Sequence, residues 1–258
     1  MHRLASKSRL PRVAVPVFVA LTLWSADTLA APDDGSTQWG LGAVATTRQR
    51  PYAGDDRQTR FLPLVFVDNR WIRVAGEGLA LKLPSAGAFS FDLRAAYVSD
   101  GYKSGNAPVL EGMADRKAGV WLGAGTIWHD PLADVSFEWL ADVSGHSDGH
   151  SAKLGIEHAF RMGRFELKPH AALKWLSAKD VDYYYGVRAD EATADRPEYH
   201  GKSTFDPELG LHAGYLLTQH QSAFVDVGTT WLGSHITDSP LVGRSTTTGV
   251  AIGYLYRF

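Results

Sequence analysis

Residues 249–258 read GVAIGYLYRF, and their pattern is the clearest indication of the fold. Its large apolar side chains occupy every second position: Val250, Ile252, Tyr254, Tyr256 and Phe258. The positions between them are mostly small or polar. Because successive side chains of a β-strand point to opposite faces, this pattern predicts a strand with one bulky apolar face.

The same alternation recurs along the chain, in residues 89–97, 135–143, 165–175, 209–217 and 223–231. A helix would scatter the intervening charges around its surface. Most of the runs approach or exceed ten residues, whereas strands of soluble sandwiches usually have about 5 to 6 and strands that cross a bilayer about 9 to 11. Aromatic residues lie near the ends of many apolar faces, as in membrane barrels. The sequence therefore predicts an all-β, transmembrane, antiparallel up-and-down barrel whose apolar faces contact outer-membrane lipid.

Short and long connections alternate between these runs. The short ones, rich in turn-forming residues, are 68–69, 85–87, 129–131, 162–164 and 218–221. The long ones are 47–58, 99–115, 144–149, 177–204 and 234–243. Short periplasmic turns and long extracellular loops are typical of outer-membrane barrels. We expect about twelve strands if residues 70–75 and 78–83 form a hairpin, and ten strands if they do not.

The first 30 residues have the pattern of a cleavable signal peptide. Four basic residues precede an apolar segment at 13–24, and small residues end at Ala30. Twelve apolar residues are too few for a membrane-spanning helix, which needs about 20. We therefore expect a signal peptide at 1–30 with cleavage near Ala30, a short periplasmic segment at 31–38 and the barrel at 39–258, in the Gram-negative outer membrane.

Composition excludes several classes of function. The 258 residues include no Cys and carry a formal net charge of −2. The chain therefore cannot form a disulfide framework, a thiolate metal site or a cysteine nucleophile. It has no basic footprint for nucleic acid. No Gly-x-Ser-x-Gly elbow, phosphate loop or dinucleotide fingerprint occurs, so we expect no cofactor, no metal and no catalytic residue.

Many charged residues fall on the inward faces of the predicted strands. They are Asp92, Arg94, Asp134, Glu138, Asp142, Lys153, Glu157, Glu166, Lys168, His170, Lys174, Glu208, His212 and Asp226. Because an unpaired buried charge costs several kcal/mol, we interpret them as an ion-pair network that fills the lumen. An acid and base pair of a hydrolase, drawn from Glu208, His212 and His170, is the alternative. Residues 146–150 (HSDGH) have a metal-like spacing but lie in a predicted turn, which favours a solvated loop.

The longest loop carries the motif on which a family resemblance rests. It contains Tyr183, Tyr184, Tyr185 and Gly186, then Glu191 with Ala192, then Arg196 and Tyr199. This pattern resembles the signature of the MltA-interacting (MipA/OmpV) family of outer-membrane proteins. The similarity extends more loosely over residues 39–258.

The resemblance implies an outer-membrane barrel that is not an enzyme. In the family's namesake, the barrel is thought to bridge a lytic transglycosylase and a murein synthase, so the resemblance implies a scaffold in peptidoglycan metabolism. A small-solute channel or an adhesin is the alternative that other members suggest. The resemblance implies that the motif residues in the longest loop form the candidate functional site.

The tyrosines also have a physical interpretation. On an extended chain, Tyr183 and Tyr185 share one side and Tyr184 faces the other. Each hydroxyl needs a partner, which Glu191 or Arg196 could supply. Two interpretations stay open: the segment plugs the barrel mouth, or it forms a stacking surface for a glycan or another protein.

The chain ends on alternating aromatic residues, Tyr254, Tyr256 and Phe258. Together with the signal peptide, this ending looks like the strand that outer-membrane barrels present to the barrel assembly machinery. We expect these three residues to form an assembly signal.

Overall fold

The computed structural model describes residues 37–258, so the predicted signal peptide and residues 31–36 lie outside the described residues. One antiparallel sheet dominates the fold. Its strands are β1 (Gln38–Gln49), β2 (Arg57–Asp68), β3 (Ile72–Ala75), β4 (Gly78–Ala86), β5 (Phe89–Val98), β6 (Gly119–His129), β7 (Asp134–Asp142), β8 (His150–Glu157), β9 (Phe160–Met162), β10 (Phe165–Leu176), β11 (Thr204–Leu216), β12 (Gln221–Trp231) and β13 (Thr246–Arg257).

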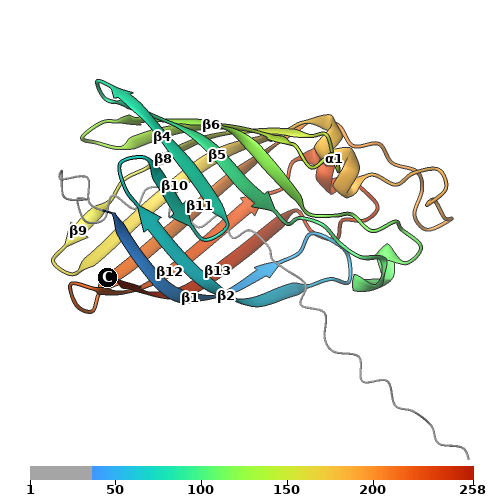
Figure 1. Ribbon diagram of the computed structural model, residues 1–258. Coiled ribbons are helices and arrows are strands. Elements are labelled where there is room, and N and C mark those ends of the chain that lie inside the picture. Colours follow the sequence, from blue (N-terminus) through green and yellow to red (C-terminus); the bar gives the residue numbers. More distant parts are fainter. Residues whose placement is uncertain (1–36) are drawn as a thin grey trace, which may run out of the picture.

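The sheet closes into a barrel in which, apart from β8 and β9, strands that are consecutive in sequence pair with each other (Figure 1). Closure comes from β13, which pairs with β1 from Gly40↔Arg257 to Arg48↔Gly249. Strands β8 and β9 both pair with β10 and follow one another along it, so they share one position in the wall. The barrel therefore has twelve strand positions, and the prediction of twelve rather than ten is confirmed.

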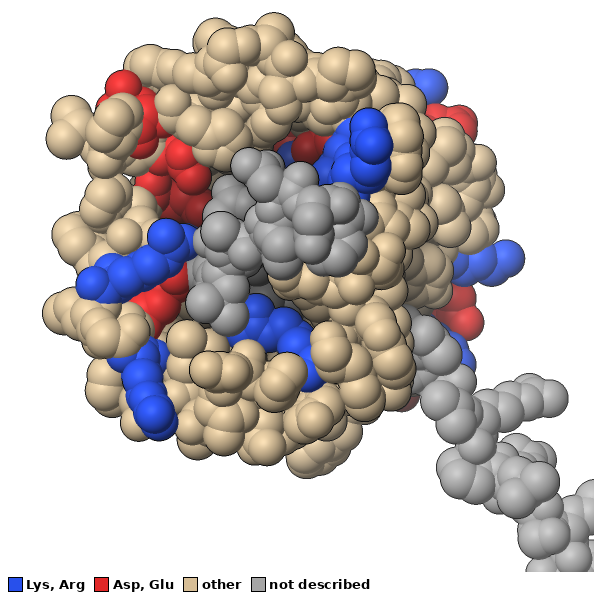
Figure 2. All heavy atoms as spheres, turned by 60° about the vertical axis from the view of Figure 1, so that its left-hand side comes forward, with Lys and Arg blue, Asp and Glu red and all other residues tan. Residues whose placement is uncertain are grey.

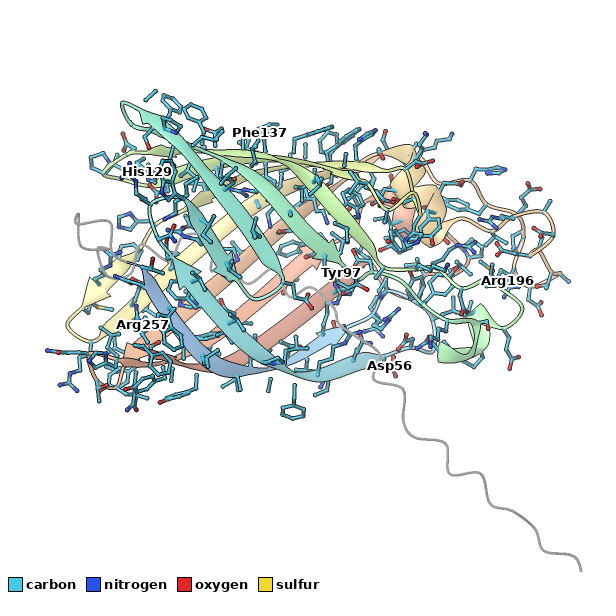
Figure 3. All side chains as sticks on the ribbon, viewed as in Figure 1. Asp56, Tyr97, His129, Phe137, Arg196 and Arg257 are labelled. Carbon is cyan, nitrogen blue, oxygen red and sulfur yellow. The ribbon has the colours of Figure 1, made fainter. Side chains whose placement is uncertain are left out.

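Burial alternates along the strands as predicted. On β7, Phe137 and Trp139 are exposed on the outside of the barrel, whereas Leu140 is buried inside. Figure 3 shows Phe137 pointing away from the wall. Exposed aromatic and aliphatic side chains cover the outer face of most of the other strands. Such a surface is stable only in an apolar solvent, which is the lipid of a membrane.

The hairpin formed by β3 and β4 is shorter than the rest of the wall. β3 pairs only with residues 66–68 of β2, and its turn at Gly76 and Glu77 lies below the outer end of the barrel. No strand among the described residues pairs with the other edge of residues 57–64 of β2. Pro63, which lacks an N–H, lies on this edge, where such a residue removes no ladder hydrogen bond.

Turns and termini define the two ends of the barrel. The chain ends beside Trp39, close to the start of β1, at the end that also carries the short turns (Figure 1). The expected short turns and long loops are therefore confirmed in their alternation. No helix within residues 37–258 is long and apolar enough to cross a membrane.

The long loops gather at the opposite end and contain all the helical turns found within residues 37–258. These are η2 (Ser104–Asn106), η3 (Pro108–Leu110), α1 (Ala178–Tyr185) and α2 (Ser234–Thr237). We call the assembly of loops 50–56, 99–118, 177–203 and 232–245 the cap.

Candidate functional site

The cap has a hydrophobic core of its own, outside the barrel wall. It brings together residues of four loops that are far apart in sequence: Tyr52, Tyr102, Leu110, Val187 and Leu241. Each of these side chains is at most 3% exposed. Because loops that pack around a common core cannot move independently, the cap forms one folded unit over the outer mouth of the barrel.

Backbone contacts join the same loops. Ala53 N donates to Leu241 O at 2.9 Å, and Gly243 N donates to Pro51 O at 2.9 Å. Val187 and Tyr199 form an antiparallel bridge within the longest loop. These hydrogen bonds hold the loops in place beyond the ends of the strands, where the hydrogen bonds of the β-sheet end.

A buried ion pair between Arg116 and Glu191 connects two of the cap loops. Arg116 Nη2 donates to Glu191 Oε2 at 2.8 Å, and Nη1 donates to Oε1 at 3.0 Å. Glu191 also accepts hydrogen bonds from the backbone N–H groups of Ala114 and Arg188. Burial alone would raise the pKa of Glu191, but these hydrogen bonds and the Arg116 charge outweigh it and lower the pKa to about 2.

Arg196 makes a second connection with its guanidinium group. Its Nη1 donates to the carbonyl oxygens of Val109 and Glu111, at 2.7 and 2.8 Å, and its Nη2 donates to Glu191 O at 2.7 Å. Three carbonyl oxygens from two loops thus share one cation. Figure 3 shows Arg196 far out in the cap, beyond the barrel wall.

The tyrosine run is helical, so the prediction of an extended chain was wrong. Tyr183, Tyr184 and Tyr185 form the last turn of α1, which Ser177 caps by accepting a hydrogen bond from Asp180 N. Ser followed three residues later by an acidic residue is a helix-start pattern, and this signal in the sequence identifies α1.

Glu191 and Arg196 are not the partners of the tyrosine hydroxyls, which corrects a second expectation. The hydroxyl of Tyr183 accepts from Lys117 N at 2.8 Å, and that of Tyr184 donates to Lys117 O at 3.1 Å. Tyr199 donates to His235 O at 2.9 Å. The hydroxyls therefore bind backbone groups of neighbouring loops.

Gly186 ends α1 in a crowded position. A Cβ at this residue would lie 2.3 Å from Asp182 O, closer than real Cβ atoms come to backbone oxygens. The residue after α1 must therefore be glycine for the loop to turn toward Tyr199. All seven motif residues thus lie in the cap, in direct contact with other cap loops or with one another.

Ion pairs join many of the predicted inward charges across the barrel lumen, so the predicted network is confirmed in part; Lys174 makes no ion pair among residues 37–258. Arg94 bridges Asp92 and Glu138, with a distance of 2.6 Å to Glu138. Two further pairs are Lys153 with Glu208 and Lys168 with Glu157.

His212 and Asp226 also pair, at 2.8 Å, across β11 and β12. Glu208 and His212, which the hydrolase interpretation combined, are thus each bound to a different partner.

The HSDGH turn is organised by a carboxylate from the end of β7. Asp142 accepts hydrogen bonds from the backbone N–H groups of Ser144, His146 and Ser147. His146 Nδ1 lies 2.8 Å from Ala118 O. Within residues 37–258, no group of three or more His, Asp or Glu side chains could hold a metal ion.

The C-terminal aromatic residues lie on the outer face of β13, at the end with the short turns. Tyr254, Tyr256 and Phe258 are exposed to the membrane side. The ring of Phe258 stacks on Trp39, with ring centroids 3.9 Å apart, and Phe258 N donates to Trp39 O. The last strand therefore joins the first one as far as the last residue.

Comparison with known proteins places this architecture in a family. The family model described as MltA-interacting protein MipA matches residues 41–258. The MltA-interacting protein of Escherichia coli K12 is 24% identical over 257 residues, covering 97% of this chain and 100% of the relative. The outer membrane protein OmpV of Vibrio cholerae is 29% identical over 157 residues, covering 61% of each chain.

Among solved structures, the COG4313 outer membrane channel from Pseudomonas putida F1 has a TM-score of 0.46 and 12% identity, covering 90% of this chain and 98% of that chain. The family match extends over almost the whole barrel and cap. The protein is thus an outer-membrane β-barrel, and it belongs to the MltA-interacting protein MipA family.

Proposed function

We propose that the protein is a non-enzymatic scaffold that holds a lytic transglycosylase and a murein synthase at the periplasmic side of the outer membrane. Family membership supports this proposal, because a relative is named for its interaction with MltA. The observation that carries it is the division of the molecule into a lumen crossed by ion pairs, a folded outer cap and a periplasmic rim with exposed apolar residues.

The periplasmic rim is the surface that such enzymes could reach. We define it by the exposed residues of the short turns: Trp71 and Leu132, with the neighbouring Arg70. Leu132 is 82% exposed, and the Arg70 guanidinium lies 4.5 Å from the ring centroid of Trp71. Figure 2 views the molecule from this end and shows charged side chains of both signs around the opening. Exposed aromatic and aliphatic residues beside arginine are typical centres of protein interfaces.

Affinity capture from detergent extracts tests the proposal. We expect the wild-type barrel to enrich a transglycosylase and a synthase, and the combined variant Trp71→Ala, Leu132→Ser to lose both. A cap variant, Tyr183→Phe, is the matched control and should capture both enzymes normally. Failure of the wild type to enrich either enzyme, or loss of capture in the cap variant alone, would contradict the proposal.

We also propose that Tyr254, Tyr256 and Phe258 form the signal read by the barrel assembly machinery. Their exposed, alternating aromatic rings support this role, because they remain accessible on β13 while the barrel is incomplete. To test this role, Phe258 is replaced and the amount of folded protein in the outer membrane is compared with that of the wild type.

A further inference from the structure

A cavity of about 250 Å³ lies at the outer end of the lumen, beneath the cap. Its lining combines strand residues of the lumen with Tyr52, Asp180 and Tyr185 of the cap. We call this space the chamber. It is smaller than the ~300–1,000 Å³ of typical pockets for drug-sized ligands, so only a small molecule fits it.

Two glycines account for part of the open space. Gly228 and Gly249 pair directly across β12 and β13, and both line the chamber. A Cβ at either position would meet its nearest neighbour at 3.7 or 3.8 Å, an ordinary contact distance. The backbone therefore tolerates larger side chains here, and the glycines leave room without being required by backbone crowding.

Two ionisable groups of the chamber, Asp180 and Lys174, have no direct partner among the described residues, although most luminal charges are paired. Asp180 is 6% exposed, and its Oδ1 is buried without a hydrogen bond. No hydrogen bond or ion pair of the Lys174 ammonium occurs within residues 37–258, although four carboxylates surround it. Asp206 is 4% exposed and accepts a hydrogen bond from Gly233 N, which leaves it free to accept further donors.

Buried ionisable groups without partners are costly, and the cost is reduced when a ligand supplies the missing partners. Together with Asp206, which can accept further donors, the groups open to a ligand are two carboxylates and one ammonium. A ligand that complements them carries one carboxylate and more than one positive group. An amino acid with a basic side chain has this combination of charges.

We propose that the chamber binds a basic amino acid, whose carboxylate contacts Lys174 and whose positively charged groups contact Asp180 and Asp206. Tyr185 covers this position from the cap side, and Thr230 and Thr247 add hydroxyl groups to the wall. Binding of this kind is a property of the barrel itself and needs no partner enzyme.

Isothermal titration of the purified full-length barrel in detergent tests the proposal. The probes are L-lysine, L-alanine, L-aspartate and cadaverine, which keeps both amines of lysine but lacks its carboxylate. We expect L-lysine to bind at least tenfold more tightly than L-alanine or cadaverine, and L-aspartate to give no heat.

Three variants test separately how the carboxylate, the ammonium group and the open space of the chamber contribute to binding. Asp180→Asn should weaken lysine binding at least tenfold, and Lys174→Met should reduce it to the level of cadaverine. Gly249→Met fills the space without removing a charge and should abolish binding of every probe. Asp130→Asn, in a periplasmic turn, is the matched control and should bind like the wild type.

The proposal would be overturned by absence of heat with L-lysine, by equal affinity for L-lysine and cadaverine, or by unchanged binding in Gly249→Met. Each variant is first shown to be a folded barrel by its migration on an unboiled gel. If Asp180→Asn or Lys174→Met does not fold, Gly249→Met and the four probes still decide the result.

Discussion

Replacement of Glu191 by alanine should open the cap while leaving the barrel folded. Glu191 is 5% exposed, and its partner Arg116 is 3% exposed. The substitution leaves the Arg116 guanidinium buried without its carboxylate. It also removes the acceptor of the Ala114 and Arg188 N–H groups.

The size of the effect follows from the burial of this pair. Removal of one partner of a buried ion pair destabilises by roughly 3 to 5 kcal/mol. Other Arg116 contacts remain, including the hydrogen bond from its Nε to Tyr183 O at 2.7 Å, so we expect about 4 kcal/mol. Since 1.4 kcal/mol is a factor of ten, the open fraction of the cap should rise about a thousandfold.

Hydrogen exchange of the solubilised protein measures this fraction directly. We expect faster exchange in residues 99–118 and 177–203 of Glu191→Ala, with unchanged protection in the barrel strands. Glu198→Ala is the matched control, because Glu198 lies in the same loop but is exposed, and within the described part of the chain its side chain bonds only to His200. Exchange in Glu191→Ala no faster than in this control would refute the reasoning.

Three further predictions concern charge, lipid contact and assembly. Burial and, to a smaller extent, the negative charge of Asp100 raise the pKa of Asp180 to about 7, although the positive charge of Lys174 opposes the shift. Asp180 therefore keeps its proton in the folded cap over a pH range in which the unfolded chain, with a pKa of about 4, has released it. Cap stability should therefore fall as the pH rises from about 4 to 7, and Asp180→Asn should flatten that slope in hydrogen exchange; equal slopes would contradict this. Leu209→Arg places a charge on the lipid face of β11 and should destabilise the barrel by about 2 to 4 kcal/mol, measured by urea titration in vesicles. Arg188→Ala, at an exposed position of the cap, is the control and should have little effect. Equal effects of the two substitutions would refute the assignment of Leu209 to the lipid face. Phe258→Ala removes the ring that stacks on Trp39 and should lower the amount of heat-modifiable protein in outer membranes, and an unchanged amount would contradict its role in assembly.

Strand faces could be predicted from the sequence because the lipid imposes period two on every segment that crosses it. Phe165 to Trp175 shows this clearly: each odd position faces lipid and each even one faces the lumen. The ion pairs were predictable as a group, since charges on an inner face must find partners there. The individual pairs depended on strand register, which the alternation alone does not determine.

The cap was less predictable, because no membrane imposes a period on it. Its core joins Tyr52, Tyr102 and Leu241, whose proximity depends on how four loops meet. The tyrosine run was assigned to an extended chain although Ser177 and Asp180 carry the helix-start pattern. Arg116, the partner of Glu191, had no distinguishing pattern around it.

The β3–β4 hairpin determines whether the wall has ten or twelve strand positions, and it is shorter than the other strand pairs. It completes the twelve positions but leaves residues 57–64 of β2 with one neighbour. The sequence indicated the short hairpin through Gly76 and Glu77, but not how far the neighbouring strands extend beyond it.

A lumen crossed by ion pairs and covered by interlocked loops should carry no steady current. Planar-bilayer recording of the purified wild-type protein is the most direct test, because it separates a capped scaffold from an open channel. We predict no steady conductance above that of the bare bilayer. Stable, stepwise conductance of the wild-type barrel would contradict the closed lumen and favour a solute channel.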